Sequence, residues 1–293
     1  MRDRVYSLGV VSLGELRIVF LGTGGGRFAT ITQKRRTGGI RFLSKGVNVH
    51  LDPGPGALVH SWNQDLDPRK IGGILVSHAH PDHYTDAEVL IEAMTGGTVK
   101  RRGVLAAARG VLKGGKTVEA AVSKYHQSLP RRTVEVLPKT RVELGDMVVV
   151  GTEAKHSDAD TVGFRFETSG GSVGYTSDTE FFEGIEKLYE GVRVLILCVL
   201  RPSGDPWQGH MTTDDAIKVV GAVRPRFVVL THFGMKMIFR GPAEEAKRVE
   251  KETGVETVAA RDGMELLLNE GVAAKRVGVD KKRQQSFDGF FRR

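Results

Sequence analysis

A dense cluster of histidine and aspartate residues occupies positions 78–83. The segment SHAHPDH directly follows the apolar run ILV and contains three histidines and one aspartate. Neutral imidazole nitrogens and carboxylate oxygens are the ligands that Zn²⁺, Fe and Mn²⁺ accept, and a cluster this dense exceeds what packing requires. At a strand end, alternation places His78 and His80 on one side, whereas the turn that follows lets Asp82 and His83 face a second point. The segment therefore predicts a metal site.

Further ligand-type residues occur along the chain in a definite order. His156 follows a β-type run, Asp178 lies in YTSD and His232 lies in VVLTHFG, while Asp52 precedes the cluster in LDPG. Together with the H-x-H-x-D-H pattern, this ordered set resembles the metallo-β-lactamase superfamily, and the resemblance spans nearly the whole chain. It implies an α/β fold, a four-layer αβ/βα sandwich in a single domain, with the site at one edge of the paired sheets.

The resemblance also implies a dinuclear metal site. In dinuclear members of the superfamily three counterparts hold each ion and one aspartate bridges both: His78, His80 and His156 for the first ion, Asp82, His83 and His232 for the second, and Asp178 between them. Zinc is the expected metal because His-rich sites suit it, while manganese and iron accept the same ligands. Asp52 matches an aspartate that steadies the metal-binding loops, since carboxylates behind the ligands orient imidazoles. A turn-forming role before Pro53 is the alternative.

Differences from other branches of the superfamily favour hydrolysis. Flavodiiron oxygen reductases carry Glu at the position of His80 and an appended flavin domain, for which this chain has no room. Classical β-lactamases usually lack the bridging aspartate and carry a secretion signal, whereas this chain has Asp178 and no such signal. The inserted domain of the β-CASP nucleases does not fit into the 54 positions from Asp178 to His232. We therefore expect a metal-dependent hydrolase.

Three stretches narrow the resemblance further. FLGTGGG, the TSD that contains Asp178, and GHMTTDDAIKVVGAVRPRFVVLTHF look like the corresponding parts of tRNase Z and its short relatives, which include cyclic phosphodiesterases. In that branch a histidine before the penultimate helix lies beside the scissile phosphate, and His210 is the matching position. Asp82 and His210 are therefore the candidate catalytic residues, with His210 as general acid or phosphate stabiliser. Thr212 or Thr213 is the expected N-cap of the helix.

Three functions remain open at this stage. The favoured one is a phosphodiesterase acting on RNA or on a cyclic or small phosphodiester, although the arm with which tRNase Z grips tRNA has no counterpart here. A thioester or lactone hydrolase, similar to glyoxalase II, shares the seven ligands and is the alternative enzyme. A basic scaffold that binds nucleic acid without catalysis is the third, but a retired site would be expected to have lost at least one ligand.

The charge of the chain indicates an anionic partner. The formal net charge is +8 and the isoelectric point is near 9.6, which suits a phosphorylated molecule or a nucleic acid such as RNA. Between Lys100 and Arg141, eleven basic residues face only Glu119 and Glu135. Solvated surface charge explains this segment equally well. A second basic stretch closes the chain within residues 271–293.

Hydrophobic runs and cysteine usage bear on the location of the protein. No apolar run approaches the roughly 18 residues that cross a bilayer, and the N-terminal segment has no small-residue cleavage site after its hydrophobic part. The single cysteine, Cys198, lies in VRVLILCVL, so a buried and inert thiol is expected. These features predict a cytoplasmic protein without membrane contact, and they leave a homodimer open.

The remaining pattern predicts the arrangement of the elements along the chain. Residues 1–270 are expected to form the hydrolase domain, and residues 271–293 a basic tail. Within the domain, a basic elaboration at 96–140 is expected to consist of loops around one strand and one helix. A helix is predicted at 85–94 and a single closing strand in VETVAARDGMELLL.

Several residues near the motifs have two plausible roles. Trp207 is a candidate for stacking on a base, with a loop anchor as an equal alternative. The glycines at 24–26 allow either a close approach to a phosphate or a sterically forced turn. Asp158 and Asp160 are expected in a capped loop and not as metal ligands. Three histidines without a motif are expected at the surface or in packing: His50, His60 and His126.

Overall fold

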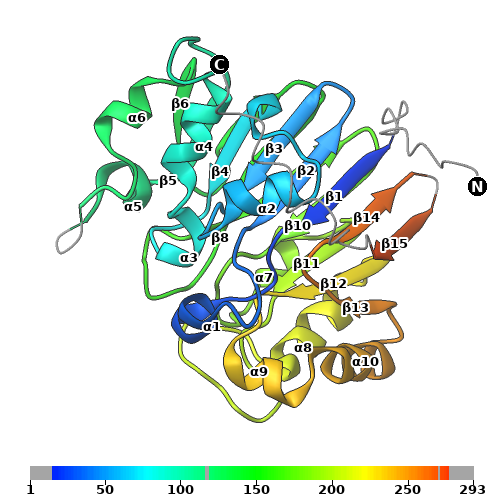
Figure 1. The fold of residues 1–293 in the computed structure, drawn as a ribbon. Coiled ribbons are helices and arrows are strands. Elements are labelled where there is room, and N and C mark those ends of the chain that lie inside the picture. The colour runs from blue at the N-terminus through cyan, green and yellow to red at the C-terminus, as the bar shows by residue number, and fades with distance from the viewer. Residues whose placement is uncertain (1–14, 116–118, 270, 277–293) are drawn as a thin grey trace, which may run out of the picture.

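Two β-sheets packed face to face form the centre of the chain, and helices cover their outer faces (Figure 1). The computed structural model describes residues 15–115, 119–269 and 271–276. In spatial order the first sheet contains β15 (Val272–Arg276), β14 (Met264–Leu268), β1 (Leu16–Phe20), β2 (Ile40–Ser44), β3 (Val47–Leu51), β4 (Gly73–Val76), β5 (Val104–Ala108) and β6 (Arg132–Val136). The second sheet contains β13 (Thr257–Ala259), β12 (Phe227–Thr231), β11 (Val194–Cys198), β10 (Gly171–Tyr175), β9 (Val162–Thr168), β8 (Met147–Glu153) and β7 (Arg141–Leu144).

The helices divide between the two sheets and one edge of the sandwich. The first sheet is covered by α2 (Ala57–Asn63), a 3₁₀ helix (Pro68–Lys70), α4 (Ala87–Met94), α5 (Arg109–Lys113) and α6 (Lys124–Ser128). The second sheet is covered by α7 (Ile185–Leu188), α8 (Thr213–Val223) and α10 (Pro242–Thr253). The edge is bordered by α1 (Gly26–Thr32), α3 (Pro81–Tyr84) and α9 (Met235–Arg240). None of the helices in the described ranges is long and apolar enough to cross a membrane.

Strand β11 shows how the two faces of one sheet pack against different layers of the sandwich. All five of its residues are apolar and buried. Because alternate side chains of a strand point to opposite faces, Ile196 packs between the two sheets, whereas Leu195 and Leu197 pack in the layer of α8 and α10. Between the sheets, Phe42 of β2 stacks on Phe166 of β9 with ring centroids 4.3 Å apart. The predicted four-layer sandwich is confirmed.

The segment at 96–140 is more regular than the sequence pattern predicted. Its described residues form two strands and two short helices, where one of each was expected. Strand β5 pairs in parallel with β4, and β6 pairs in parallel with β5, so the segment extends the first sheet. Its glycines and basic residues masked this continuation, because they lower both the hydrophobicity and the alternation that indicate a strand.

The C-terminal part of the chain also differs from the prediction. VETVAARDGMELLL forms two strands and not one, since β13 joins the second sheet and β14 joins the first. The turn between them needs Gly263, whose φ is +81°. The predicted tail begins as β15, which pairs with β14 up to Arg276, and residues 277–293 lie outside the described residues. The helix predicted at 85–94 begins at Ala87, after the separate short helix α3.

Candidate metal centre

Five strands end at the same edge of the sandwich, and a candidate residue follows each of them. In the first sheet Asp52 follows β3 and His78 follows β4, and these two strands are parallel. In the second sheet His156, Asp178 and His232 follow β8, β10 and β12. These three strands share a direction, because β8 and β10 both run antiparallel to β9 while β10, β11 and β12 are parallel. The topology therefore gathers residues up to 180 positions apart.

A turn after β4 sets the direction of the motif side chains. His80 has extended backbone angles and occupies the cap of α3, whose first residue is Pro81. Proline suits the first helical position because its fixed φ matches the helix and its missing N–H loses no bond there. The backbone N–H of His83 then donates to the His80 carbonyl at 2.8 Å. This turn separates His78 and His80 from Asp82 and His83, and the two pairs fall into different ligand groups.

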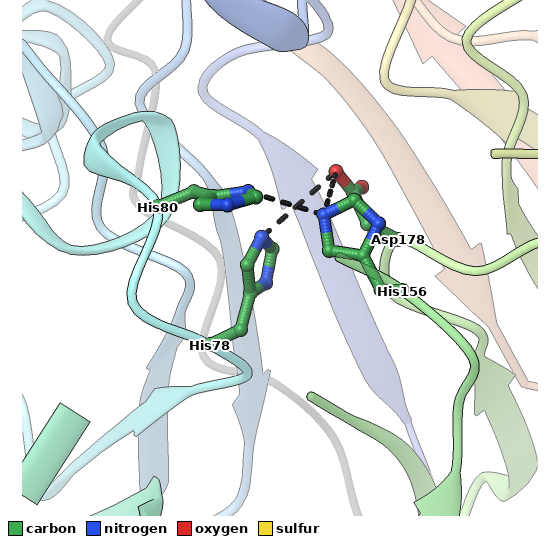
Figure 2. A group of neighbouring side chains, drawn as sticks. All are labelled: His78, His80, His156 and Asp178. Carbon is green, nitrogen blue, oxygen red and sulfur yellow. Dashed lines mark hydrogen bonds and ion pairs between the residues drawn. The ribbon is translucent and has the colours of Figure 1, made fainter. Parts of the chain in front are cut away.

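The first ligand group contains His78, His80, His156 and Asp178, whose potential ligand atoms all lie within 4.8 Å of one another. Figure 2 shows the three imidazoles and the carboxylate pointing toward a common point. His156 Nε2 lies 3.1 Å from His80 Nδ1 and 3.8 Å from Asp178 Oδ2. His78 Nε2 lies 3.9 Å from the same carboxylate oxygen.

The second ligand group contains Asp82, His83 and His232. His232 Nε2 lies 3.1 Å from His83 Nε2 and 3.3 Å from Asp82 Oδ2. Asp178 adjoins this group as well, because its Oδ1 lies 3.1 Å from His232 Nε2 while its Oδ2 faces the first group. The structure thus brings together all seven residues that the sequence singled out, with Asp178 between the two sets.

The chemistry of these groups fits bound cations. His78 Nε2 and Asp178 Oδ1 are buried and have no hydrogen-bond partner among the described residues, and buried polar atoms of this kind call for a ligand. Burial holds the pKa of His78 well below its usual value, so the imidazole is neutral, as a metal ligand must be. Burial alone would lower the pKa of His83, but the carboxylates of Asp178, Asp82 and Asp52 raise it to about 10. These three carboxylates favour positive charge at this point, as a cation site requires.

Asp52 fixes the second group from behind. Its Oδ2 accepts hydrogen bonds from His83 Nδ1 at 3.0 Å, from the Ser77 hydroxyl at 2.8 Å and from the Tyr175 hydroxyl at 2.7 Å. Its Oδ1 accepts the backbone N–H of Ser77 at 2.7 Å. Because the carboxylate can only accept, the proton of His83 is held on Nδ1 and Nε2 is left facing the cluster. The turn-forming alternative for Asp52 does not explain these contacts.

The glycine loop before α1 packs directly on the second group. A Cβ atom at Gly25 would lie 2.2 Å from the ring of His232, so only glycine fits there. The backbone N–H of Gly26 donates to Asp82 Oδ2 at 2.7 Å. Beside the phosphate approach and the forced turn considered for this loop, these contacts show a different role, close packing against His232 and Asp82, and the Gly26 N–H is already engaged.

A cleft of about 1330 Å³ opens over the first group. His210 lines it, with Nδ1 3.6 Å from Asp178 Oδ2 and its ring centroid 4.7 Å from that of His156. Burial lowers the pKa of His210 to about 4, so the ring is neutral and keeps one N–H donor. The residue belongs to neither ligand group. Thr212 caps the following helix in a capping box with Asp215, which resolves the choice between Thr212 and Thr213.

The model of the beta-lactamase superfamily domain matches residues 47–233. The chain belongs to the beta-lactamase superfamily. An uncharacterised protein of Methanocaldococcus jannaschii is 40% identical over 259 residues, which are 88% of this chain and 97% of that protein. A metal-dependent hydrolase of Anaeromyxobacter is 30% identical over 200 residues, or 62% of this chain and 66% of that one. These relatives and the His/Asp cluster support a metal-dependent hydrolase of the superfamily.

Solved structures of this superfamily share the fold. A metallo-beta-lactamase fold protein from Bacillus subtilis is 18% identical with a TM-score of 0.72, covering 86% of this chain and 99% of that one. The short form of human tRNase Z is 17% identical with a TM-score of 0.62, covering 90% of this chain and 99% of that one. The resemblance to tRNase Z-like members of the superfamily, first indicated by the motifs, is confirmed.

For four further residues of the chain, the structure agrees only partly with the roles that the sequence predicted. Asp158 is not in a ligand group, but its Oδ2 accepts the N–H of Ala79 at 2.9 Å and so fixes the motif segment. Cys198 is buried as expected, yet it lies against Asp178 and His232. Burial raises the pKa of its thiol well above the usual range, so it stays protonated. His126 lies beside Glu88 and Glu92 near the surface, and His60 is half-buried.

Two buried polar residues had no signal in the sequence. Tyr175 ends a strand that looks like any apolar strand, and its hydroxyl function is visible only through Asp52 in the other sheet. Arg41 is fully buried in β2 and donates to His50 Nδ1 at 3.1 Å and to the Ser61 hydroxyl at 2.7 Å. His50 is therefore a packing histidine, as one of its two expected roles.

Proposed function

We propose that the chain is a dinuclear metal-dependent phosphodiesterase acting on RNA or on a cyclic or small phosphodiester. One observation carries the phosphodiester class: His210 borders the cleft beside Asp178 without belonging to either ligand group. A phosphodiester benefits from such a group, because an alkoxide departs poorly without a proton or a hydrogen bond. The likeness of the fold to human tRNase Z supports the same class.

The metal ligands are part of this proposal. Zinc is the first candidate because imidazole-rich sites suit it, and manganese or iron accepts the same donors. Divalent cations bound here supply a water molecule of lowered pKa and offset the negative charge of a phosphoryl group. The proposed ligands are His78, His80 and His156 for one ion, Asp82, His83 and His232 for the other, and Asp178 for both.

The remaining groups of the cleft bind and orient the substrate. Arg27, Lys155 and Lys236 line the cleft, and their positive charge attracts an anionic substrate. As a neutral ring, His210 donates a hydrogen bond from its N–H to the oxygen of the leaving group, whereas transfer of a proton to that oxygen requires the imidazolium form of the ring. Asp82, held by the Gly26 N–H, keeps its carboxylate at the reacting centre.

The His210→Ala variant tests this assignment. We expect the metal content to stay at two ions per chain, because His210 is in neither ligand group. Turnover of a diester with a poor alkoxide leaving group should fall roughly 10²- to 10⁴-fold, the usual effect of losing a general acid. Hydrolysis of bis-p-nitrophenyl phosphate should fall much less if His210 donates a proton, since p-nitrophenolate needs little protonation. Equal losses identify a phosphate-binding role, and no loss on either substrate removes His210 from the site.

The matched control is His126→Ala, which removes an imidazole that pairs with Glu88 and Glu92 on the outer side of the first sheet. It should change neither metal content nor turnover. A thioester panel run beside the diesters tests the class of reaction. Preferred turnover of thioesters or lactones by the wild type would contradict the phosphodiesterase and favour the alternative hydrolase.

A further inference from the structure

Two large aromatic side chains stand exposed on the walls of the cleft. Phe28 of α1 is 71% exposed and Trp207, in the loop before α8, is 61% exposed, and both line the cleft over the metal centre. Large apolar rings exposed inside a concave site mark a place where a ligand covers them. Neither ring serves the hydrophobic cores of the described residues.

Trp207 is held in place by an anchored arginine. The guanidinium of Arg201 lies 5.5 Å from the centroid of the Trp207 ring. Arg201 is itself fixed by Asp205, with Nη2 2.6 Å from Oδ1 and Nε donating to the backbone carbonyl at 3.0 Å. A cation over an aromatic face stabilises the ring position. Arg201 holds this loop through its bonds to Asp205. A role of Trp207 as the anchor of the loop therefore does not explain why its ring is exposed.

The backbone couples this ring to the reacting centre. The N–H of His210 donates to the Trp207 carbonyl at 3.1 Å, and the intervening Gly209 donates its N–H to Glu180 at 3.1 Å. The Gly209 carbonyl in turn accepts His156 Nδ1 at 2.8 Å. The loop that carries Trp207 is therefore bonded to His156 through Gly209 and contains His210 three positions later.

The cations of the cleft are not equivalent. Lys236 and Arg201 share the carboxylate of Asp205 as an ion-pair partner, with Lys236 Nζ 3.0 Å from it. Arg27 and Lys155 form no ion pair with the described part of the chain, and both line the cleft and are exposed. Two uncompensated cations are thus available to an anionic group, next to two exposed rings.

We propose that this wall of the cleft is a nucleotide subsite: Trp207 and Phe28 stack on a base, and Arg27 and Lys155 bind a phosphate of the same chain. This subsite would make a nucleotide unit part of the substrate, so the inference rests on the proposed phosphodiesterase function. Aromatic rings suit any base, because every base has a π-face, so the subsite accepts single-stranded nucleotides with little sequence preference.

The chain offers a built-in reporter, since it contains two tryptophans, Trp207 and Trp62. Trp62 lies in α2, is 49% exposed and is covered by Arg69 at 5.4 Å, so it matches Trp207 but does not line the cleft. In Trp62→Phe, the tryptophan fluorescence comes from Trp207 alone. Adenosine 5′-monophosphate should quench this fluorescence to saturation, whereas ribose 5-phosphate at the same occupancy should not.

Calorimetric titration of the metal-loaded protein gives the decisive comparison. Trp207→Leu should weaken binding of adenosine 5′-monophosphate roughly 5- to 150-fold, the range for losing one base–aromatic stack, and leave ribose 5-phosphate binding unchanged. Trp207→Phe should restore most of the loss, and Trp62→Leu should have no effect. Equal affinity of the wild type for the two ligands, or an equal loss for both in Trp207→Leu, would overturn the subsite.

Failure of the subsite and failure of the proposed function are distinguishable. Hydrolysis of bis-p-nitrophenyl phosphate without base-dependent binding refutes the subsite and retains the phosphodiesterase. Base-dependent binding that is lost in Trp207→Leu, in a protein that hydrolyses no diester, retains the subsite and refutes the phosphodiesterase.

Discussion

His80 and His83 are three positions apart in the sequence, yet their surroundings differ sharply. His83 is buried, and Asp52, Ser77 and Tyr175 form a hydrogen-bonded set behind it. His80 lines the cleft, and in the described part of the chain the only hydrogen-bond distance to its ring is from His156. The surroundings of His83, here called the buried half of the centre, are therefore fixed by the core. The surroundings of His80, here called the open half, face the cleft and are accessible to ligands.

This difference assigns separate tasks to the two halves. The position of His83 in the buried half depends on Asp52, which is hydrogen-bonded to Ser77 after a strand of the first sheet and to Tyr175 in the second. None of these three supporting residues lines the cleft. The open half depends on the loop at 207–210, through the bond from His156 Nδ1 to the Gly209 carbonyl. Substitutions in the core should therefore change how the protein holds a metal ion, whereas substitutions in the cleft should change how it handles substrate.

Asp178 is the residue that belongs to both halves, so its removal should have the largest effect. In Asp178→Ala we expect fewer than two ions per chain and a loss of diester hydrolysis of roughly 10³-fold, because the charge facing both groups disappears. Metal analysis after reconstitution measures the first effect. Asp160→Ala is the matched control, since Asp160 is in neither ligand group. Two tightly bound ions in Asp178→Ala would end the idea of a shared bridging ligand.

The buried half can be disturbed without touching a ligand by the variant Tyr175→Phe. Loss of the hydroxyl removes one of the donors that set Asp52, and residues behind metal ligands typically contribute 10- to 100-fold in affinity. We expect one of the two ions to bind about 10-fold more weakly in a chelator competition, while the other is retained.

Tyr189→Phe provides the control for Tyr175→Phe. Tyr189 is also fully buried and its hydroxyl bonds to Thr152 at 2.8 Å and to the Tyr175 carbonyl, but not to Asp52. Both variants should lose about 1 kcal/mol of stability, the usual value for one hydrogen bond. Only Tyr175→Phe should change metal affinity. Equal metal affinity in the two variants would contradict the view that the buried half is set from the core.

The sequence predicted the ligands better than it predicted their support. Residue type and spacing identify His78, His80 and Asp82 as candidate ligands, because few other roles need those side chains so close together. Tyr175 and Arg41 carry no such signal: each is one residue in an ordinary strand, and its partners lie in other segments. Spacing along the chain reports local chemistry, whereas support from another sheet emerges only when the sheets are packed.

The same limit explains the errors in the fold. The near-continuous apolar runs of β11 and β12 predicted strands, because both faces of each strand are buried. At 96–140 one strand was expected and two are present; β6, at the edge of the first sheet, contains charged residues and is exposed or half-buried up to Val136. Hydrophobic patterning is a weaker guide where a strand has fewer neighbours to bury it.

Surface cations outside the cleft should have the smallest effect, and should act on substrate alone. Arg102 is engaged with the backbone carbonyls of Arg69 and Ile71, so we restrict the test to Arg101, Arg131 and Arg132, which are exposed.

Substrate reaches the centre through the open half, and long-range attraction changes its affinity without changing metal content. In the triple alanine variant, the slope of log affinity against log salt for an RNA oligomer should fall by up to about 2, because each lost phosphate contact removes about 0.7 for a single strand. Alanines at Lys247, Arg248 and Lys251 of α10, which are also exposed, remove the same net charge and serve as the control. An unchanged slope in the triple variant, with intact metal content, would show that these three cations of the 100–141 segment are solvated surface charge.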